Sequence, residues 1–123
     1  MARNDLFSGS KIALICDETL LVYQRDDVDH IPFPALWDLP GGGREGNETP
    51  EECALRELEE EFGLCFDVDR LSWKHRYESD RPEGLATYFF VGTLKKEEIT
   101  SICFGDEGQR WQMMDITSFL NAG

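Results

Sequence analysis

The stretch from Gly42 to Leu64 constrains this chain most, because it combines clear helix signals with a high concentration of carboxylates. Its 23 residues hold eight glutamates and two arginines, a local charge of −6. Like charges one turn apart on a helix cost about 0.2–0.5 kcal/mol per pair. A helix that keeps such a cluster indicates that a positively charged group neutralises it.

The boundaries of this helix are marked by residues that favour helix ends. Thr49 is a good N-cap, Pro50 suits the first helical position, and Glu52 completes a capping box with Thr49. Gly63 favours a stop after the last turn. The sequence therefore predicts a helix over residues 50–62.

The predicted helix separates its apolar and acidic residues onto different arcs. Four apolar residues share one arc and are expected to face the core: Ala54, Leu55, Leu58 and Phe62. Three glutamates share an arc roughly 120° away: Glu57, Glu60 and Glu61. With the glycines before the helix, they could supply oxygen ligands to a hard cation such as Mg²⁺. The competing interpretation is a solvated acidic face, the usual location of a charge run.

Composition excludes several classes of protein. The chain has 123 residues, 41% of them hydrophobic, which predicts one globular domain over residues 1–123. A net charge of −13 argues against a nucleic-acid polymer as partner. No signal peptide or membrane-spanning run is recognisable, so we expect a soluble cytoplasmic protein. The four cysteines are scattered and are expected to be reduced, mostly buried thiols.

The rest of the chain alternates strand and turn signals. Five segments are predicted as strands: 11–16, 19–24, 71–78, 85–94 and 109–114. The first two are expected to pair as a hairpin, and so are 71–78 and 85–94, the former with Leu71, Trp73 and Tyr77 on a buried face. Residues 95–100 are expected to form a connector, and Asp115 to cap a short C-terminal helix over 116–121. This order predicts an α+β fold around one mixed sheet.

The glutamate-rich stretch resembles the Nudix box of the Nudix hydrolases, G-x5-E-x7-R-E-U-x-E-E-x-G-U, where U is aliphatic. All fixed positions match: Gly42, Glu48, Arg56, Glu57, Leu58, Glu60, Glu61, Gly63 and Leu64. The preceding segment from Trp37 to Gly41 is similar to the usual lead-in. The resemblance implies an α/β/α sandwich and an enzyme that cuts a diphosphate bond in a nucleoside diphosphate derivative, using Mg²⁺ or Mn²⁺.

The resemblance also implies roles for individual residues. The metal ligands would be Glu57, Glu60 and Glu61, with the Gly42 carbonyl as a further ligand and Glu48 in support. Arg56 would orient Glu57 through a charge-assisted contact. The general base is left open among Glu57, Glu60 and Glu107, which lies in an acidic loop between two glycines. His75 is interpreted as structural.

The substrate is predicted less sharply than the chemistry. Gly41, Gly42 and Gly43 would let the backbone approach the ligand closely. Four aromatic residues could either stack on a base or belong to the core: Phe33, Trp37, Tyr88 and Trp111. The chain is similar to small family members that hydrolyse nucleoside triphosphates; the alternatives are a nucleotide-sugar, ADP-ribose or dinucleoside polyphosphate hydrolase, and a nucleotide-binding module without turnover. A homodimer is possible, since dimers are common among similar proteins.

Overall fold

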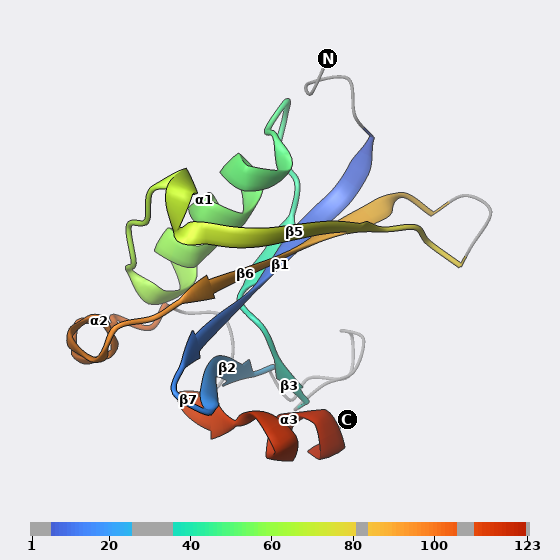
Figure 1. The fold of residues 1–123 in the computed structure, drawn as a ribbon. Coiled ribbons are helices and arrows are strands. Elements are labelled where there is room, and N and C mark those ends of the chain that lie inside the picture. The colour runs from blue at the N-terminus through green and yellow to red at the C-terminus, as the bar shows by residue number, and fades with distance from the viewer. Residues whose placement is uncertain (1–5, 26–35, 81–83, 106–109, 123) are drawn as a thin grey trace.

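The computed structural model describes residues 6–25, 36–80, 84–105 and 110–122 (Figure 1). Its elements follow in the order β1 (Phe7–Cys16), β2 (Thr19–Gln24), β3 (Trp37–Asp38), β4 (Gly41–Gly43), α1 (Pro50–Phe62), a 3-10 turn (Val68–Arg70), β5 (Leu71–Tyr77), β6 (Ala86–Thr93), α2 (Lys96–Thr100), β7 (Arg110–Asp115) and α3 (Ile116–Ala122). None of the helices in these ranges is long and apolar enough to cross a membrane.

The strands form one mixed sheet that forks between β1 and β2. Its main order is β3-β2-β1-β6-β5, while β4 also pairs with β1 and β7 with β2. β1 runs parallel to β6 and antiparallel to its other partners. The β1–β2 ladder joins only Ile15 to Leu20 and Cys16 to Thr19. Beyond these pairs the two strands diverge, and the glycine strand β4 pairs with the freed half of β1.

A separate apolar core lies on each face of the sheet, and α1 and α3 lie on opposite sides of it (Figure 1). On the α1 side, Ile12 and Leu14 of β1 pack with Leu58 and Phe62 of the helix. On the α3 side, Ala13 belongs to the second cluster, against which Ile116 and Phe119 pack. The predicted α/β/α sandwich with a mixed sheet is therefore confirmed.

The predicted central helix is confirmed with both of its ends. The Thr49 hydroxyl accepts a hydrogen bond from the Glu52 N–H, and the Glu52 carboxylate accepts one from the Thr49 N–H. Gly63 ends α1 in the left-handed conformation, with φ 68°. The antiparallel β5–β6 pair and the α3 cap are confirmed too, since the Asp115 carboxylate accepts from the Ser118 N–H.

Three predictions about burial and local structure are wrong. Trp73 and Tyr77 of β5 are not on a buried face; they are 46% and 50% exposed. Leu55 is only half-buried, because the buried arc of α1 is centred nearer Glu61 and includes Cys53 instead. The connector at 95–100 contains a short helix, α2, whose Lys95 N–H donates to Glu98.

The cysteines are less buried than expected. Cys53 lies in the core and Cys16 is half-buried, but Cys65 and Cys103 are exposed. The Cys65 thiol donates a hydrogen bond to the Glu59 carboxylate, and this bond raises the pKa of the thiol.

Candidate active site

Two of the predicted metal-binding glutamates, Glu57 and Glu61, are buried between α1 and the glycine strand. Glu57 is 9% exposed and Glu61 only 4%. The Gly41 N–H donates to Glu61 Oε1 over 3.0 Å. The Glu57 carboxylate lies against the Cα of Gly42, so that a Cβ at position 42 would collide with it. The absence of a side chain at Gly42 thus makes room for a side chain of α1, while the predicted approach of the glycine run to a ligand stays a prediction.

The fork in the sheet makes this arrangement possible. Gly42 pairs with Ser10 and Gly41 with Lys11, in the half of β1 that β2 has left. The Ser10 hydroxyl donates to the Pro50 carbonyl over 2.9 Å, which ties β1 to the first turn of α1. The Gly42 carbonyl oxygen accepts a contact from the Cys53 thiol at 3.5 Å. Local helix signals and long-range strand pairing thus place Glu57 together with β4.

Arg56 is the centre of an ion-pair network beside these carboxylates. Its guanidinium donates to both oxygens of Glu48, with Nε 2.6 Å from Oε2 and Nη2 3.1 Å from Oε1. Nη1 also lies 3.3 Å from Glu57 Oε2 and 3.1 Å from Glu60 Oε1. Nη2 donates to the Gly43 carbonyl over 2.8 Å. The expected contact between Arg56 and Glu57 is present, but the bidentate pair of hydrogen bonds goes to Glu48.

The network changes the acidity of its members. Burial raises the pKa of Glu48, but hydrogen bonds from Arg56 and from the Glu45 N–H outweigh it and leave the pKa below its ordinary value. The hydrogen bond to Glu48 raises the pKa of Arg56. Both groups are therefore charged at neutral pH, and Arg56 faces more than one carboxylate.

The three glutamates of the predicted metal site do not converge on one point. The Glu60 side chain is 55% exposed and turned toward Arg56. Within the described residues, no group of three acidic, histidine or cysteine side chains is arranged to hold a metal ion. The donor chemistry nevertheless fits Mg²⁺ or Mn²⁺, because Glu57 and Glu61 bury two carboxylates one turn apart. Burial of two like charges is costly, and a divalent cation would offset that cost.

Glu107, the late candidate base, lies outside the described residues. The segment before it is fixed to the end of α1. The Cys103 N–H donates to the Phe62 carbonyl over 3.0 Å, and the Gly105 N–H donates to the Glu61 carbonyl over 2.8 Å. The last described residue before this loop is therefore in contact with the helix that carries the glutamates.

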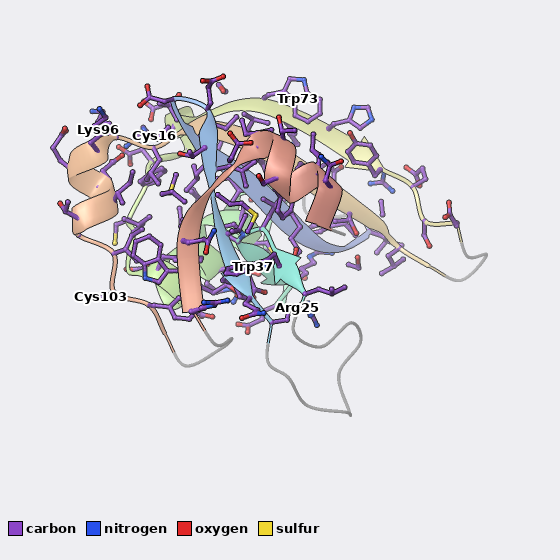
Figure 2. The ribbon with its side chains drawn as sticks, turned by 90° about the horizontal axis from the view of Figure 1, so that it is seen from below. Cys16, Arg25, Trp37, Trp73, Lys96 and Cys103 are labelled. Carbon is purple, nitrogen blue, oxygen red and sulfur yellow. The ribbon has the colours of Figure 1, made fainter. Side chains whose placement is uncertain are left out.

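The aromatic residues predicted to stack on a base have different surroundings. Tyr88 is a core residue, packed edge-on against Phe7 at 5.5 Å. Trp37 is half-buried and is labelled near the centre of the view in Figure 2, with the Arg110 guanidinium 5.2 Å from its ring centre. Trp111 packs against the α1-side core, and Phe33 lies outside the described residues. Of the three that the structure describes, only Trp37 combines partial exposure with a neighbouring cation.

Two surface hollows border the site. The larger, about 650 Å³, runs along the outer side of α1 and reaches Arg56 and Glu48 but not the buried glutamates; it is lined by Glu45, Asn47, Glu48, Glu52, Leu55, Arg56, Glu59, Cys65 and Phe66. The smaller, about 230 Å³, lies where β1, β4 and β6 meet; it is lined by Ser8, Gly9, Ser10, Lys11, Gly42, Gly43 and Thr87. Sequence reasoning did not place Ser8, Gly9, Lys11 or Thr87 beside the glycine strand. The residue pattern within one strand does not show which other strands pair with it.

Comparison with known proteins gives consistent matches. The NUDIX domain family matches residues 9–122. An 8-oxo-dGTP diphosphatase of Proteus vulgaris is 38% identical over 90 residues, covering 71% of this chain and 77% of its own. An RNA pyrophosphohydrolase of Erythrobacter litoralis is 38% identical, covering 63% of this chain and 48% of its own. Diphosphoinositol polyphosphate phosphohydrolase 3-alpha of Mus musculus is 37% identical, covering 85% and 60%.

Among solved structures, a similar fold is found in a bifunctional NMN adenylyltransferase/ADP-ribose pyrophosphatase of Francisella tularensis, complexed with AMP and a manganese ion. The TM-score is 0.68 at 20% identity, covering 94% of this chain and 37% of the other. This is a likeness of fold. The chain spans most of the Proteus relative but only about half to 60% of the other two curated relatives.

Proposed function

This chain belongs to the Nudix family and is a hydrolase of pyrophosphate bonds, and from that premise we propose that it is a nucleoside triphosphate pyrophosphohydrolase dependent on a divalent metal. It would convert a nucleoside triphosphate into the monophosphate and pyrophosphate. The observation that carries this proposal is the burial of Glu57 and Glu61 against the glycine strand, beside the Arg56 network.

Five groups are proposed to hold Mg²⁺ or Mn²⁺: the carboxylates of Glu48, Glu57, Glu60 and Glu61 and the carbonyl of Gly42. The bound ion would neutralise phosphate charge and lower the pKa of a coordinated water. Glu60 would have to turn away from Arg56 to take part, since its Oε1 now lies 3.1 Å from Nη1. Glu48 would act mainly by holding Arg56 in place.

The chain's own residues would position the reacting groups and move the proton. Phosphoryl-type transfer depends mostly on positioning and charge neutralisation. Arg56 would orient Glu57 and Glu60, because one guanidinium nitrogen contacts both. One carboxylate would accept the proton of the attacking water. The candidates for this base are Glu57, Glu60 and Glu107.

The substrate is proposed from the relatives and the charge of the chain. The Proteus vulgaris relative, by its name, acts on 8-oxo-dGTP, which supports a nucleoside triphosphate. The net charge of −13 disfavours long RNA, despite the relative named as an RNA pyrophosphohydrolase. ADP-ribose, nucleotide sugars and dinucleoside polyphosphates are the alternatives. A binding module without turnover is disfavoured, because every carboxylate of the box is present.

A substrate panel tests the activity. Wild type, Glu57→Gln and Glu60→Gln are incubated with nucleotides and Mg²⁺ or Mn²⁺, and the release of monophosphate and pyrophosphate is measured. Glu59→Gln is the matched control, because Glu59 is an exposed glutamate of the same helix that contacts Cys65. Wild type and Glu59→Gln should turn over, while the other two lose most of the rate. Equal turnover by all four proteins would contradict the proposal.

Metal binding has a readout that does not need turnover. Added Mn²⁺ should raise the thermal midpoint of wild type and Glu59→Gln, because a ligand that binds only the folded state stabilises it. The rise should be smaller in Glu57→Gln, which loses a buried charged oxygen. A single domain over 1–123, a cytoplasmic location and a homodimer stay predictions; size-exclusion chromatography checks the last of these.

A further inference from the structure

We propose that three exposed rings on β5, the ring strip Trp73–His75–Tyr77, bind the planar base of the substrate. The strip would hold the base while the diphosphate lies across the sheet at the glycine strand. This inference rests on the proposed function, and it identifies the residues that would distinguish a nucleotide from a diphosphate without an aromatic group.

The rings of the strip form a continuous aromatic surface. The Trp73 and His75 rings are stacked, with centroids 5.6 Å apart and planes 11° apart. His75 and Tyr77 follow at 4.4 Å, and Tyr77 meets Phe89 of β6 edge-on at 6.0 Å. Figure 2 shows Trp73 at the rim of the molecule, directed away from the core. About half of the Trp73 and Tyr77 surfaces is exposed, so the strip is accessible to a ligand.

Strand register connects the strip to the glycine strand. His75 pairs with Phe89, Phe89 with Lys11, and Lys11 with Gly41. Residues paired across neighbouring strands point to the same face of the sheet. Phe89 packs with the α3-side core, so the strip and Lys11 also lie on that face. Three strand spacings separate β5 from β4, a distance of about 14 Å.

The next set of residues paired across these strands includes two glycines, which leave space above the sheet. Tyr77 pairs with Thr87, Thr87 with Gly9, and Gly9 with Gly43. Two of the four positions lack side chains, and the 230 Å³ hollow lies over them. A Cβ at Gly43 would meet only the Ser8 carbonyl, at 3.8 Å, so the space above Gly43 is not filled by the described residues.

The chemistry along this path matches a nucleotide from one end to the other. Aromatic rings stack on any base, because each base has a π face. The Lys11 ammonium, 2.9 Å from Asp38, supplies positive charge between the rings and the glycine strand. Glu57 and Glu61 contact this strand from the other face of the sheet, at Gly42 and Gly41. A polyol diphosphate would gain nothing from the rings.

A second copy of this chain is the main competing occupant, because β5 is the edge strand of the described sheet. Two chains of charge −13 repel each other, and this repulsion disfavours a second copy of the chain as the occupant of the strip. Dimerisation through the strip becomes an outcome of the test below.

The test compares nucleotide and base-free substrates in strip variants. Trp73→Ala and Tyr77→Ala are assayed with a nucleoside triphosphate and with inorganic tripolyphosphate, next to the control Val68→Ala, an exposed apolar residue outside the sheet. Each strip variant should raise KM for the nucleotide about tenfold, with kcat little changed. KM for tripolyphosphate should stay constant. Trp73→Phe, which keeps a ring, should restore most of the affinity.

The possible results separate this inference from the proposed function. If nucleotides are hydrolysed with the same KM by wild type and strip variants, the inference is wrong and the proposed function stands. If wild type hydrolyses only tripolyphosphate, both are wrong. Size-exclusion chromatography is run on the same proteins: a dimer that Trp73→Ala dissociates, without change in nucleotide KM, would assign the strip to self-association instead.

Discussion

Arg56 and Arg70 make the same kind of contact in two regions of the molecule, yet their surroundings differ in charge. Each holds a glutamate with two hydrogen bonds: Arg56 holds Glu48, and Arg70 holds Glu98 with both N···O distances at 2.8 Å. Arg70 also donates to the Thr93 carbonyl and lies over the Phe66 ring at 3.9 Å. In each region the bound carboxylate has a lowered pKa.

The difference lies in the carboxylates beyond this pair. Arg70 has one carboxylate partner among its described ion pairs, so the charges around it balance. Arg56 contacts four, Glu45, Glu48, Glu57 and Glu60, and its single charge cannot balance them. The Arg70 region is complete as a structural link between the 3-10 turn, β6 and α2. The Arg56 region keeps an excess of negative charge, as a metal-binding site requires.

Glutamine substitutions should give the largest contrast between the two regions. Glu57→Gln should lower kcat by about 10²–10⁴, because it removes a buried charged oxygen from the proposed metal and base set. Glu98→Gln should leave kcat unchanged, since the described hydrogen bonds of the Glu98 carboxylate go to Arg70 and to the Lys95 N–H and to no residue of the box. Steady-state kinetics on the best substrate of the panel measures both. A comparable loss in Glu98→Gln would remove the distinction between the regions.

Replacing each arginine by lysine should sharpen the contrast. A lysine keeps the charge but cannot form the two parallel bonds of a guanidinium. Arg56→Lys should lower kcat/KM about 10- to 100-fold, by the size of effect seen when the partner of a metal ligand is lost. Arg70→Lys should keep full activity. Normal activity in Arg56→Lys would mean that Arg56 acts only through its charge.

Stability should show the same order. Arg70→Ala should destabilise the protein by about 1–2 kcal/mol, because it removes a two-bond ion pair whose side chains are 27% and 23% exposed, together with a ring contact. Arg56→Ala should cost more, because it leaves Glu48, Glu57 and Glu60 without the cation that they share. Urea unfolding without metal measures both. A smaller loss in Arg56→Ala than in Arg70→Ala would contradict this account of the Arg56 network.

The pH dependence of stability should show the smallest effect. Glu98 has a folded-state pKa below its ordinary value of 4.5, mainly because of the hydrogen bonds from Arg70, so it contributes stability above pH 4.5 that is lost as the pH falls through the folded pKa. Glu98→Gln should therefore flatten the acid limb below pH 4.5 by a fraction of a kcal/mol. Thermal unfolding followed from about pH 3 to about pH 6 measures this effect. An unchanged acid limb would contradict the assignment.

The helix of the site was predictable because its signals are local. Thr49, Glu52 and Gly63 mark its ends through contacts within a few residues, and all three behave as expected. The box residues were recognisable for the same reason. Their burial was not: Glu57 and Glu61 are enclosed by β4, whose position depends on pairing with β1 more than thirty residues earlier in the chain.

β5 shows where pattern reasoning fails. The alternation in 71–78 correctly placed Trp73 and Tyr77 on one face of a strand. It could not indicate whether that face is covered, because period-2 alternation records only which residues share a face. The structure leaves the face half exposed, with the His75 ring between those of Trp73 and Tyr77.

By itself, the sequence determined the family, the helix and its caps, and the identity of the carboxylates, because each depends on residues within one short segment. The tertiary structure decided which glutamates are buried, that Arg56 meets Glu48 most closely, and that rings on β5 share a register with the glycine strand. These features arise where the sheet forks and strands distant in sequence pair. Side-chain spacing along the chain holds no information about that pairing, so only the folded arrangement of β1, β4, β6 and β5 determines them.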